Sequence, residues 1–137
     1  MSPVRKVLSA GAVAAIAAGG SIAVALEANA AAGCRVDYAV TNQWQGGFGA
    51  AVSVTNLGDP IDGWTLAFSF AAGQSITQLW NGSFTQSGSA VTVTNAAHNA
   101  PVATNGSVSF GFNGSWTGSN PAPTTFTLNG TACAVTP

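Results

Sequence analysis

The chain has 137 residues, a formal net charge of −1 and only 5% charged residues, and its length predicts a single domain. Beyond residue 30 the charged side chains are Arg35, Asp37, Asp59 and Asp62, and lysine is absent there. So weak a charge argues against nucleic acid and anionic membranes as partners, because both are attracted by strong positive fields. The remaining polar residues are mostly Gly, Ser, Thr and Asn, which favours a neutral, hydrogen-bonding partner.

The first 30 residues have the pattern of a secretory signal peptide. Two positive charges precede an apolar stretch over 7–26, and a small-x-small sequence ends at Ala30, where we expect cleavage, with Ala32 as the second choice. The apolar stretch approaches membrane-spanning length, so a transmembrane anchor is the competing interpretation, and Gly33-Cys34 leaves a lipoprotein as a third. The glycines and the cleavage pattern favour the signal peptide. We therefore expect a secreted protein with one mature domain over 31–137.

This mature domain holds two cysteines, Cys34 and Cys133, one near each end. In a compartment that permits disulfides, their pairing closes nearly the whole domain into one loop. The alternatives are two unrelated free thiols, which is unusual in a secreted protein, and metal ligation, for which only one histidine is available. We expect the disulfide, and neither a metal site nor a cofactor.

Apolar residues alternate with small or polar ones in several stretches, which predicts β-strands with one buried and one solvent-exposed face. In chain order these stretches are 36–41, 48–55, 64–70, 75–79, 91–93, 107–112 and 126–128, of which 36–41 and 75–79 are the weakest. Asn-Gly and Gly-Asp-Pro turn sequences separate them, and no helical period follows residue 30. Seven or more short strands at this spacing predict an all-β fold, an antiparallel sandwich or barrel. Its core would be dense in aromatic residues: Phe48, Trp64, Phe68, Phe70, Phe110, Phe112 and Phe126.

The four tryptophans differ in their surroundings. Trp64 falls in the apolar register of a strand, whereas Trp44, Trp80 and Trp116 lie among Asn, Gln, Gly and Ser. A large flat apolar ring in so polar a setting is costly to expose unless a ligand docks on it. A sugar ring, with its patch of C–H bonds, fits such a surface. The sequence therefore predicts binding of an insoluble polysaccharide.

Several motifs, in the same order along the whole mature domain, resemble those of the family 2 carbohydrate-binding modules. The matching segments are Cys34-Arg-Val-Asp-Tyr38, Asn42-Gln-Trp44, Gly47-Phe48, Trp64-Thr-Leu-Ala-Phe-Ser-Phe70, Gln78-Leu-Trp-Asn81, Phe110-Gly-Phe-Asn-Gly114 and Leu128-Asn-Gly130 with Cys133. These are bacterial modules, usually attached to cellulases, xylanases and chitinases. The resemblance implies an antiparallel β-sandwich of jelly-roll or immunoglobulin-like type with a disulfide joining its ends. It also implies a flat strip of surface aromatics that lies on crystalline cellulose, and often on chitin.

The resemblance further implies roles for individual residues. Trp44 and Trp80 match two of the family's three sugar-stacking tryptophans. Gln78 and Asn113 match polar residues beside them that hydrogen-bond to sugar hydroxyls. Gly47 is typical of the cellulose-binding subfamily, because the xylan-binding subfamily tends to carry arginine there, which turns the neighbouring tryptophan out of the plane.

Two positions depart from the family pattern. His98 stands where the third stacking tryptophan belongs, and Ala51 replaces an asparagine that flanks the strip. A neutral imidazole still stacks on a sugar, over less area than an indole, so His98 is a candidate ligand residue, and its protonation should weaken adsorption at pH 5 relative to pH 8. The alternative is a solvated loop histidine. Trp116 matches a position where the family admits tryptophan or histidine, and we do not assign it to the strip.

The same residues argue against an enzyme. Hydrolysis of a glycosidic bond usually needs two facing carboxylates. Of the three mature aspartates, Asp59 and Asp62 flank Pro60 in one turn, where acceptor side chains are typical. We therefore expect a monomeric, non-catalytic module for crystalline cellulose. The alternatives are a chitin-binding module, a cell-surface or substrate adhesion protein, and a fragment of a glycoside hydrolase.

Overall fold

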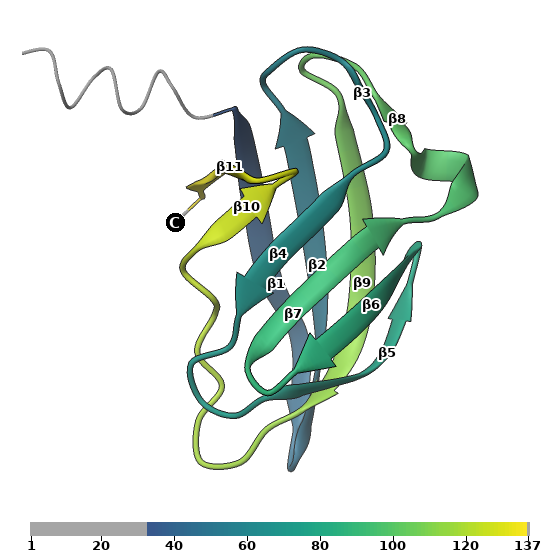
Figure 1. The fold of residues 1–137 in the computed structure, drawn as a ribbon. Helices are drawn as coiled ribbons and strands as arrows, with labels where there is room; N and C mark the ends of the chain where they lie inside the picture. Colours follow the sequence, from purple (N-terminus) through teal and green to yellow (C-terminus); the bar gives the residue numbers. More distant parts are fainter. Residues whose placement is uncertain (1–32, 137) are drawn as a thin grey trace, which may run out of the picture. The chain divides into compact units, whose positions relative to one another are not determined.

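The computed structural model describes residues 33–136, so the predicted signal peptide and its cleavage site lie outside the described residues. Two five-stranded sheets pack face to face as a β-sandwich, which confirms the predicted fold class (Figure 1). Within the described residues, none of the helical structure is long and apolar enough to cross a membrane.

Each sheet combines strands that are distant in the sequence. Sheet I has the order β12-β1-β2-β9-β5, with β1 (Cys34–Trp44), β2 (Gly47–Asn56), β5 (Ser75–Trp80), β9 (Ser107–Ser115) and β12 (Ala134–Val135). Sheet II has the order β11-β10-β4-β7-β6, with β4 (Thr65–Ser69), β6 (Gly82–Ser87), β7 (Ala90–Asn95), β10 (Phe126–Leu128) and β11 (Thr131–Ala132). A short ribbon pairs β3 (Ile61–Asp62) with β8 (Pro101–Val102), and one 3-10 turn, η1 (Ala97–Asn99), precedes β8. Strands β1 and β12 pair in parallel, whereas β1–β2, β2–β9 and β5–β9 are antiparallel.

The alternation in the sequence places one face of each long strand in the core between the sheets. On β2, Phe48, Val52 and Val54 are at most 1% exposed. Trp64 is also 1% exposed, and its ring stacks on Phe110 with the ring centroids 5.9 Å apart. All seven aromatic residues predicted for the core are buried in it. Removal of this aromatic surface from water is the main favourable term in folding of the sandwich.

The predicted disulfide is confirmed. Cys34 and Cys133 are bonded, with their Cα atoms 4.6 Å apart. Cys34 begins β1, and Cys133 lies between β11 and β12, so the bond ties the first strand of the sandwich to its last segment. Close by, the backbone N–H of Thr136 donates to the carbonyl of Val36 at 2.9 Å. Both ends of the described chain are therefore fastened at the same end of sheet I.

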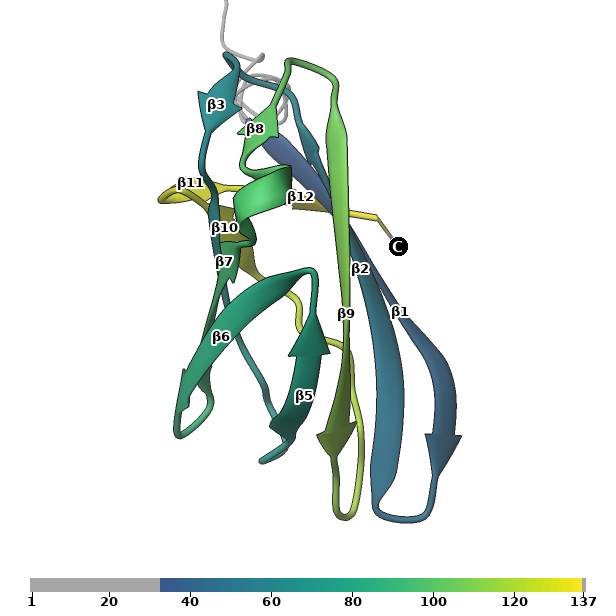
Figure 2. The ribbon, with the colours of Figure 1, turned by 90° about the vertical axis from the view of Figure 1, so that its right-hand side faces the viewer.

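The structure also contains strands that the sequence analysis did not predict. β6 has one large apolar side chain, the half-buried Phe84, because this strand is an edge of sheet II with little to cover. β3, β8, β11 and β12 are two residues long, too short to show alternation. Figure 2 shows β5 and β6 side by side where the edges of the two sheets meet, joined through Asn81. The end of β5, which carries Trp80, therefore lies at a corner of the sandwich.

Candidate functional site

Trp44 and Trp80 both lie on the outer face of sheet I, the face that points away from the core. They are 47% and 46% exposed, whereas Trp64 is buried. Trp44 ends β1 and Trp80 ends β5, on opposite sides of the two central strands β2 and β9. The structure therefore brings the two predicted stacking residues to one surface.

A β-bulge turns Trp44 outward. Along β1, Val36 and Val40 belong to the inward register, since they pair with the buried residues Val54 and Ala50. Strict alternation from these positions would also turn Trp44 toward the core. The pairing register shifts between Val40 and Asn42, and this shift moves Trp44 to the outer face.

A second bulge does the same for Trp80 on β5. Ile76 is buried, and by alternation Gln78 and Trp80 would be buried too. The register shifts between Ile76 and Gln78, so Leu79 packs against the core while Gln78 and Trp80 point outward. The hydroxyl of Thr77, the residue at the shift, donates to a carbonyl of β9 at 3.1 Å and holds the bulge in place. Bulges recur next to functional sites, where they redirect a side chain.

Each exposed indole lies across a glycine of a central strand. Trp44 pairs with Gly47, where a Cβ atom would collide with Nε1 of the indole. Trp80 pairs with Gly111, where a Cβ atom would lie 2.5 Å from Cζ2 of the indole. Glycine inside a strand often marks such a close approach. Because these glycines lack side chains, both rings rest against the sheet instead of standing away from it.

A row of amide side chains lies between the two tryptophans. Across the four strands this outward row is Asn42, Gly49, Asn113 and Gln78. Asn113 Nδ2 donates to Gln78 Oε1 at 3.4 Å. A Cβ atom at Gly49 would lie 2.5 Å from Asn42 Oδ1 and 3.4 Å from Asn113 Oδ1, so these two amides converge above Gly49. Sequence reasoning missed Asn42 as a site residue, although its place two residues before Trp44, beyond the bulge, puts both on one face.

His98 lies beside the Trp80 end of this face and not on sheet I. It is exposed and belongs to η1, the coil next to β8 in Figure 2. Asn99 Nδ2 donates to the carbonyl of Asn81 at 2.8 Å, and Trp64 Nε1 donates to the carbonyl of Asn99 at 3.0 Å. Because Asn81 directly follows Trp80, the first bond fastens the segment that carries His98 to that end of the face, and the second ties it to the buried Trp64.

Trp116 is not one of the exposed tryptophans. Its side chain is half-buried and packs against the core, and its ring N–H donates to the backbone carbonyl of Trp44. Ala51 is exposed on the outer face, opposite Gly111, and contributes no hydrogen-bonding group where the family pattern has asparagine. The outer face therefore carries two exposed indole rings and a row of amides.

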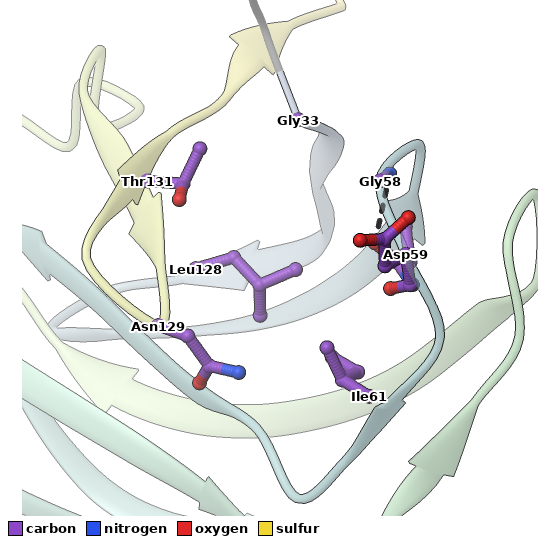
Figure 3. Close-up of a pocket in the computed structure, with 8 residues that line it drawn as sticks. Gly33, Gly58, Asp59, Ile61, Leu128, Asn129 and Thr131 are labelled. Atoms are coloured by element: carbon purple, nitrogen blue, oxygen red, sulfur yellow. Dashed lines mark hydrogen bonds between the residues drawn. The ribbon is translucent and has the colours of Figure 1, made fainter.

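The pocket in Figure 3 lies beside the start of β1, at the opposite end of that strand from Trp44. Its volume is about 190 Å³, with Ile61 and Leu128 on its apolar side and Asp59 at its rim. Asp59 is the only carboxylate among the described residues that line the pocket. The pocket therefore lacks the two facing carboxylates that glycosidic hydrolysis usually needs. The described part of the chain also holds no group of three or more His, Cys, Asp or Glu residues that could bind a metal ion.

Comparison with known proteins gives consistent matches over this domain. A family model described as a cellulose binding domain matches residues 34–133. Endoglucanase CelA of Streptomyces lividans is 55% identical over 108 residues, which cover 78% of this chain and 24% of that protein. The chain therefore spans about a quarter of the length of this curated relative.

Two solved structures of single domains are also similar. The cellulose-binding family 2 carbohydrate-binding domain of ScLPMO10C is 38% identical with a TM-score of 0.56, covering 67% of this chain and 92% of that one. The chitin-binding domain of Chi18aC from Streptomyces coelicolor is 37% identical with a TM-score of 0.59, covering 73% and 93%. The matched residues 34–133 run from the first bridged cysteine to the second and include both exposed tryptophans. The chain thus belongs to the family of cellulose-binding domains that its motifs resemble, the family 2 carbohydrate-binding modules.

Proposed function

We propose that the outer face of sheet I binds insoluble polysaccharide, primarily crystalline cellulose, without catalysing a reaction on it. The observation that carries this proposal is the placement of Trp44 and Trp80. Both rings are about half exposed, both rest on glycines, and both belong to the same face of one sheet. Such a surface offers apolar rings to the C–H faces of sugars.

The energetics favour a solid lattice over short soluble sugars. An indole that loses roughly 100 Å² of apolar surface to a sugar ring gains about 2.5 kcal/mol at ~25 cal/mol per Å². Two indoles give about 5 kcal/mol, which only matches the low end of the ~4–15 kcal/mol cost of association. The chains of a lattice are already ordered, so they lose less freedom on binding. We therefore expect weak binding of short oligosaccharides and strong adsorption to the solid.

The amides between the rings supply the polar part of the site. Asn42, Asn113 and Gln78 are neutral donors and acceptors, and each hydrogen bond to a sugar hydroxyl would contribute ~0.5–1.5 kcal/mol. The two rings are separated by the length of several sugar units. Gly47 lies opposite Ser115, four residues from Gly111 along β9, which is about 14 Å at ~3.4 Å per residue. A ligand that touches both rings must therefore be an extended chain.

Chitin is the second candidate ligand. It is favoured by the 37% identity to a domain whose structure is described as chitin-binding. Cellulose takes precedence because the family model is described as a cellulose binding domain and the ScLPMO10C domain as cellulose-binding. The predicted signal peptide supports an extracellular role, where such solids are found, as a monomeric binding module. Attachment to a plant-derived surface, or delivery of a hydrolase to it, would both use this face.

The proposal is tested by depletion isotherms of the protein on microcrystalline cellulose, chitin and insoluble xylan, with calorimetry against soluble cello-oligosaccharides. We expect the highest partition coefficient on cellulose, weak binding of the oligosaccharides, and no soluble sugar released from any solid. Equal low retention on all three solids would contradict the proposal. Release of soluble sugar would contradict the non-catalytic assignment.

Gly111→Ala and Gly47→Ala are expected to weaken adsorption to cellulose roughly tenfold each, although neither change removes a sugar-binding group. The new methyl group would occupy the space of the indole and lift one edge of the ring from the sheet. The measurement is the same isotherm, with Ser109→Ala as the control, because Ser109 lies on the same face of β9 two residues from Gly111. Unchanged adsorption of Gly111→Ala would show that the plane of the Trp80 ring does not matter.

His98→Trp is expected to tighten adsorption about fivefold, since an indole covers roughly 40 Å² more of a sugar than an imidazole. The measurement is the depletion isotherm on microcrystalline cellulose. Unchanged adsorption of His98→Trp would remove His98 from the site.

A further inference from the structure

Trp116 is fastened to the turn that carries Trp44. Gln45 and Gly46 form this turn between β1 and β2, and Gly46 has a φ of 80°, in the left-handed region that favours glycine. The indole Nε1 of Trp116 donates to the carbonyls of Trp44 and Gly47, both at 3.0 Å. Its backbone N–H donates to the carbonyl of Gly46 at 3.3 Å. One residue thus binds three carbonyls of the turn.

We propose that Trp116 is a positioning residue, whose ring N–H holds the β1–β2 turn so that the Trp44 ring faces the polysaccharide. The inference rests on the proposed function, because that function assigns Trp44 to the ligand. One of the carbonyls that Trp116 binds belongs to Trp44 itself, so the hydrogen bond restrains the backbone from which the stacking ring projects. Trp116 packs against the core and need not touch the sugar.

The end of β1 needs such an external restraint. β12 pairs only with Arg35 and Val36, so the rest of β1 is an outer strand of sheet I. The bulge after Val40 interrupts its ladder with β2 shortly before Trp44. Bulged and two-stranded ribbons twist more strongly than central strands, and added twist would tilt the Trp44 ring. An N–H shared between two carbonyls, a common three-centre arrangement, restrains the twist at that position.

Trp80 is held by different contacts. Its strand, β5, lies on the other side of β9, and the Thr77 bulge and the bond between Asn99 and Asn81 position its end. The effect of Trp116 should therefore be confined to Trp44. This separation allows the inference to be tested within a single face.

Two substitutions distinguish the effect of the ring N–H of Trp116 from the effect of the size of its ring. Trp116→Phe keeps an apolar ring and removes the donor, whereas Trp116→His keeps a ring N–H in a smaller side chain. We expect Trp116→Phe to lower the partition coefficient on microcrystalline cellulose about five- to tenfold, and Trp116→His to lower it less although it fills less volume. Thermal unfolding midpoints are measured alongside. Wild-type adsorption of Trp116→Phe, or stronger adsorption of Trp116→Phe than of Trp116→His, would overturn the inference.

Double variants distinguish positioning from a general loss of stability. Trp116→Phe should have little further effect in a Trp44→Ala background and its full effect in a Trp80→Ala background. Equal effects in the two backgrounds would overturn the inference. If Trp116→Phe does not fold, Trp116→His in the same backgrounds decides the question. If Trp44→Ala by itself leaves adsorption unchanged while Trp80→Ala weakens it, Trp116 has no stacking residue to position, and the inference is overturned. If neither variant weakens adsorption, the proposed function is wrong as well.

Discussion

Loss of the Cys34–Cys133 disulfide is expected to lower the free energy of unfolding by about 4–5 kcal/mol. The bridged residues are 99 positions apart, so the bond closes nearly all of the described domain into one loop and restricts the unfolded chain. Folded domains are typically stable by about 5–15 kcal/mol, so this loss is a large share of the total. The measurement compares urea unfolding of the oxidised wild type with that of the Cys34→Ala/Cys133→Ala double variant.

Adsorption provides the control for this prediction. Trp44 lies at the other end of β1 from Cys34, so the folded double variant should adsorb to cellulose like the wild type at low temperature. A difference in unfolding free energy below about 1 kcal/mol would contradict the prediction. It would mean that the noncovalent contacts of the chain ends, such as the bond between Thr136 and Val36, hold them without covalent closure.

The long strands of the sandwich could be predicted from the sequence because every second residue along them is apolar and buried in the core. Phe48 to Val54 and Trp64 to Phe70 alternate without interruption, and the structure buries one face of each stretch. The edge strand β6 was not predicted because it needs few apolar residues. β6 is covered by sheet II on one side only and has Phe84 as its single large apolar residue.

The candidate site was predicted less completely, and the bulges explain why. The apolar pattern of β1 before the bulge, in Val36 and Val40, gives by extrapolation an inward Trp44, and that of β5 gives an inward Trp80. Polar neighbours and the family resemblance marked both residues as exposed, but neither identified the register shift that exposes them. The role of Gly111 beneath Trp80 follows only from strand pairing. Long-range register is the part of the structure that local patterns leave open.

Trp44→Ala and Trp80→Ala are each expected to weaken adsorption to crystalline cellulose roughly 60-fold. The figure follows from about 2.5 kcal/mol for roughly 100 Å² of indole surface, with 1.4 kcal/mol for each factor of ten. The rings belong to different strands and rest on different glycines, so their contributions should add. The double variant should then show no measurable depletion from solution over microcrystalline cellulose.

Leu57→Ala is the matched control for these variants. Leu57 is a 39% exposed apolar side chain in the loop after β2, at the opposite end of that strand from the Trp44 turn. If exposed apolar surface of any kind drove adsorption, Leu57→Ala would weaken it too, whereas stacking on the outer face predicts no effect.

Because both indoles are about half exposed, the alanine variants should keep thermal unfolding midpoints near that of the wild type. Wild-type adsorption of the Trp44→Ala/Trp80→Ala double variant would contradict the outer face as the binding surface. A loss confined to one single variant would mean that the lattice meets the sheet at an angle, on the side of β1 or on the side of β5.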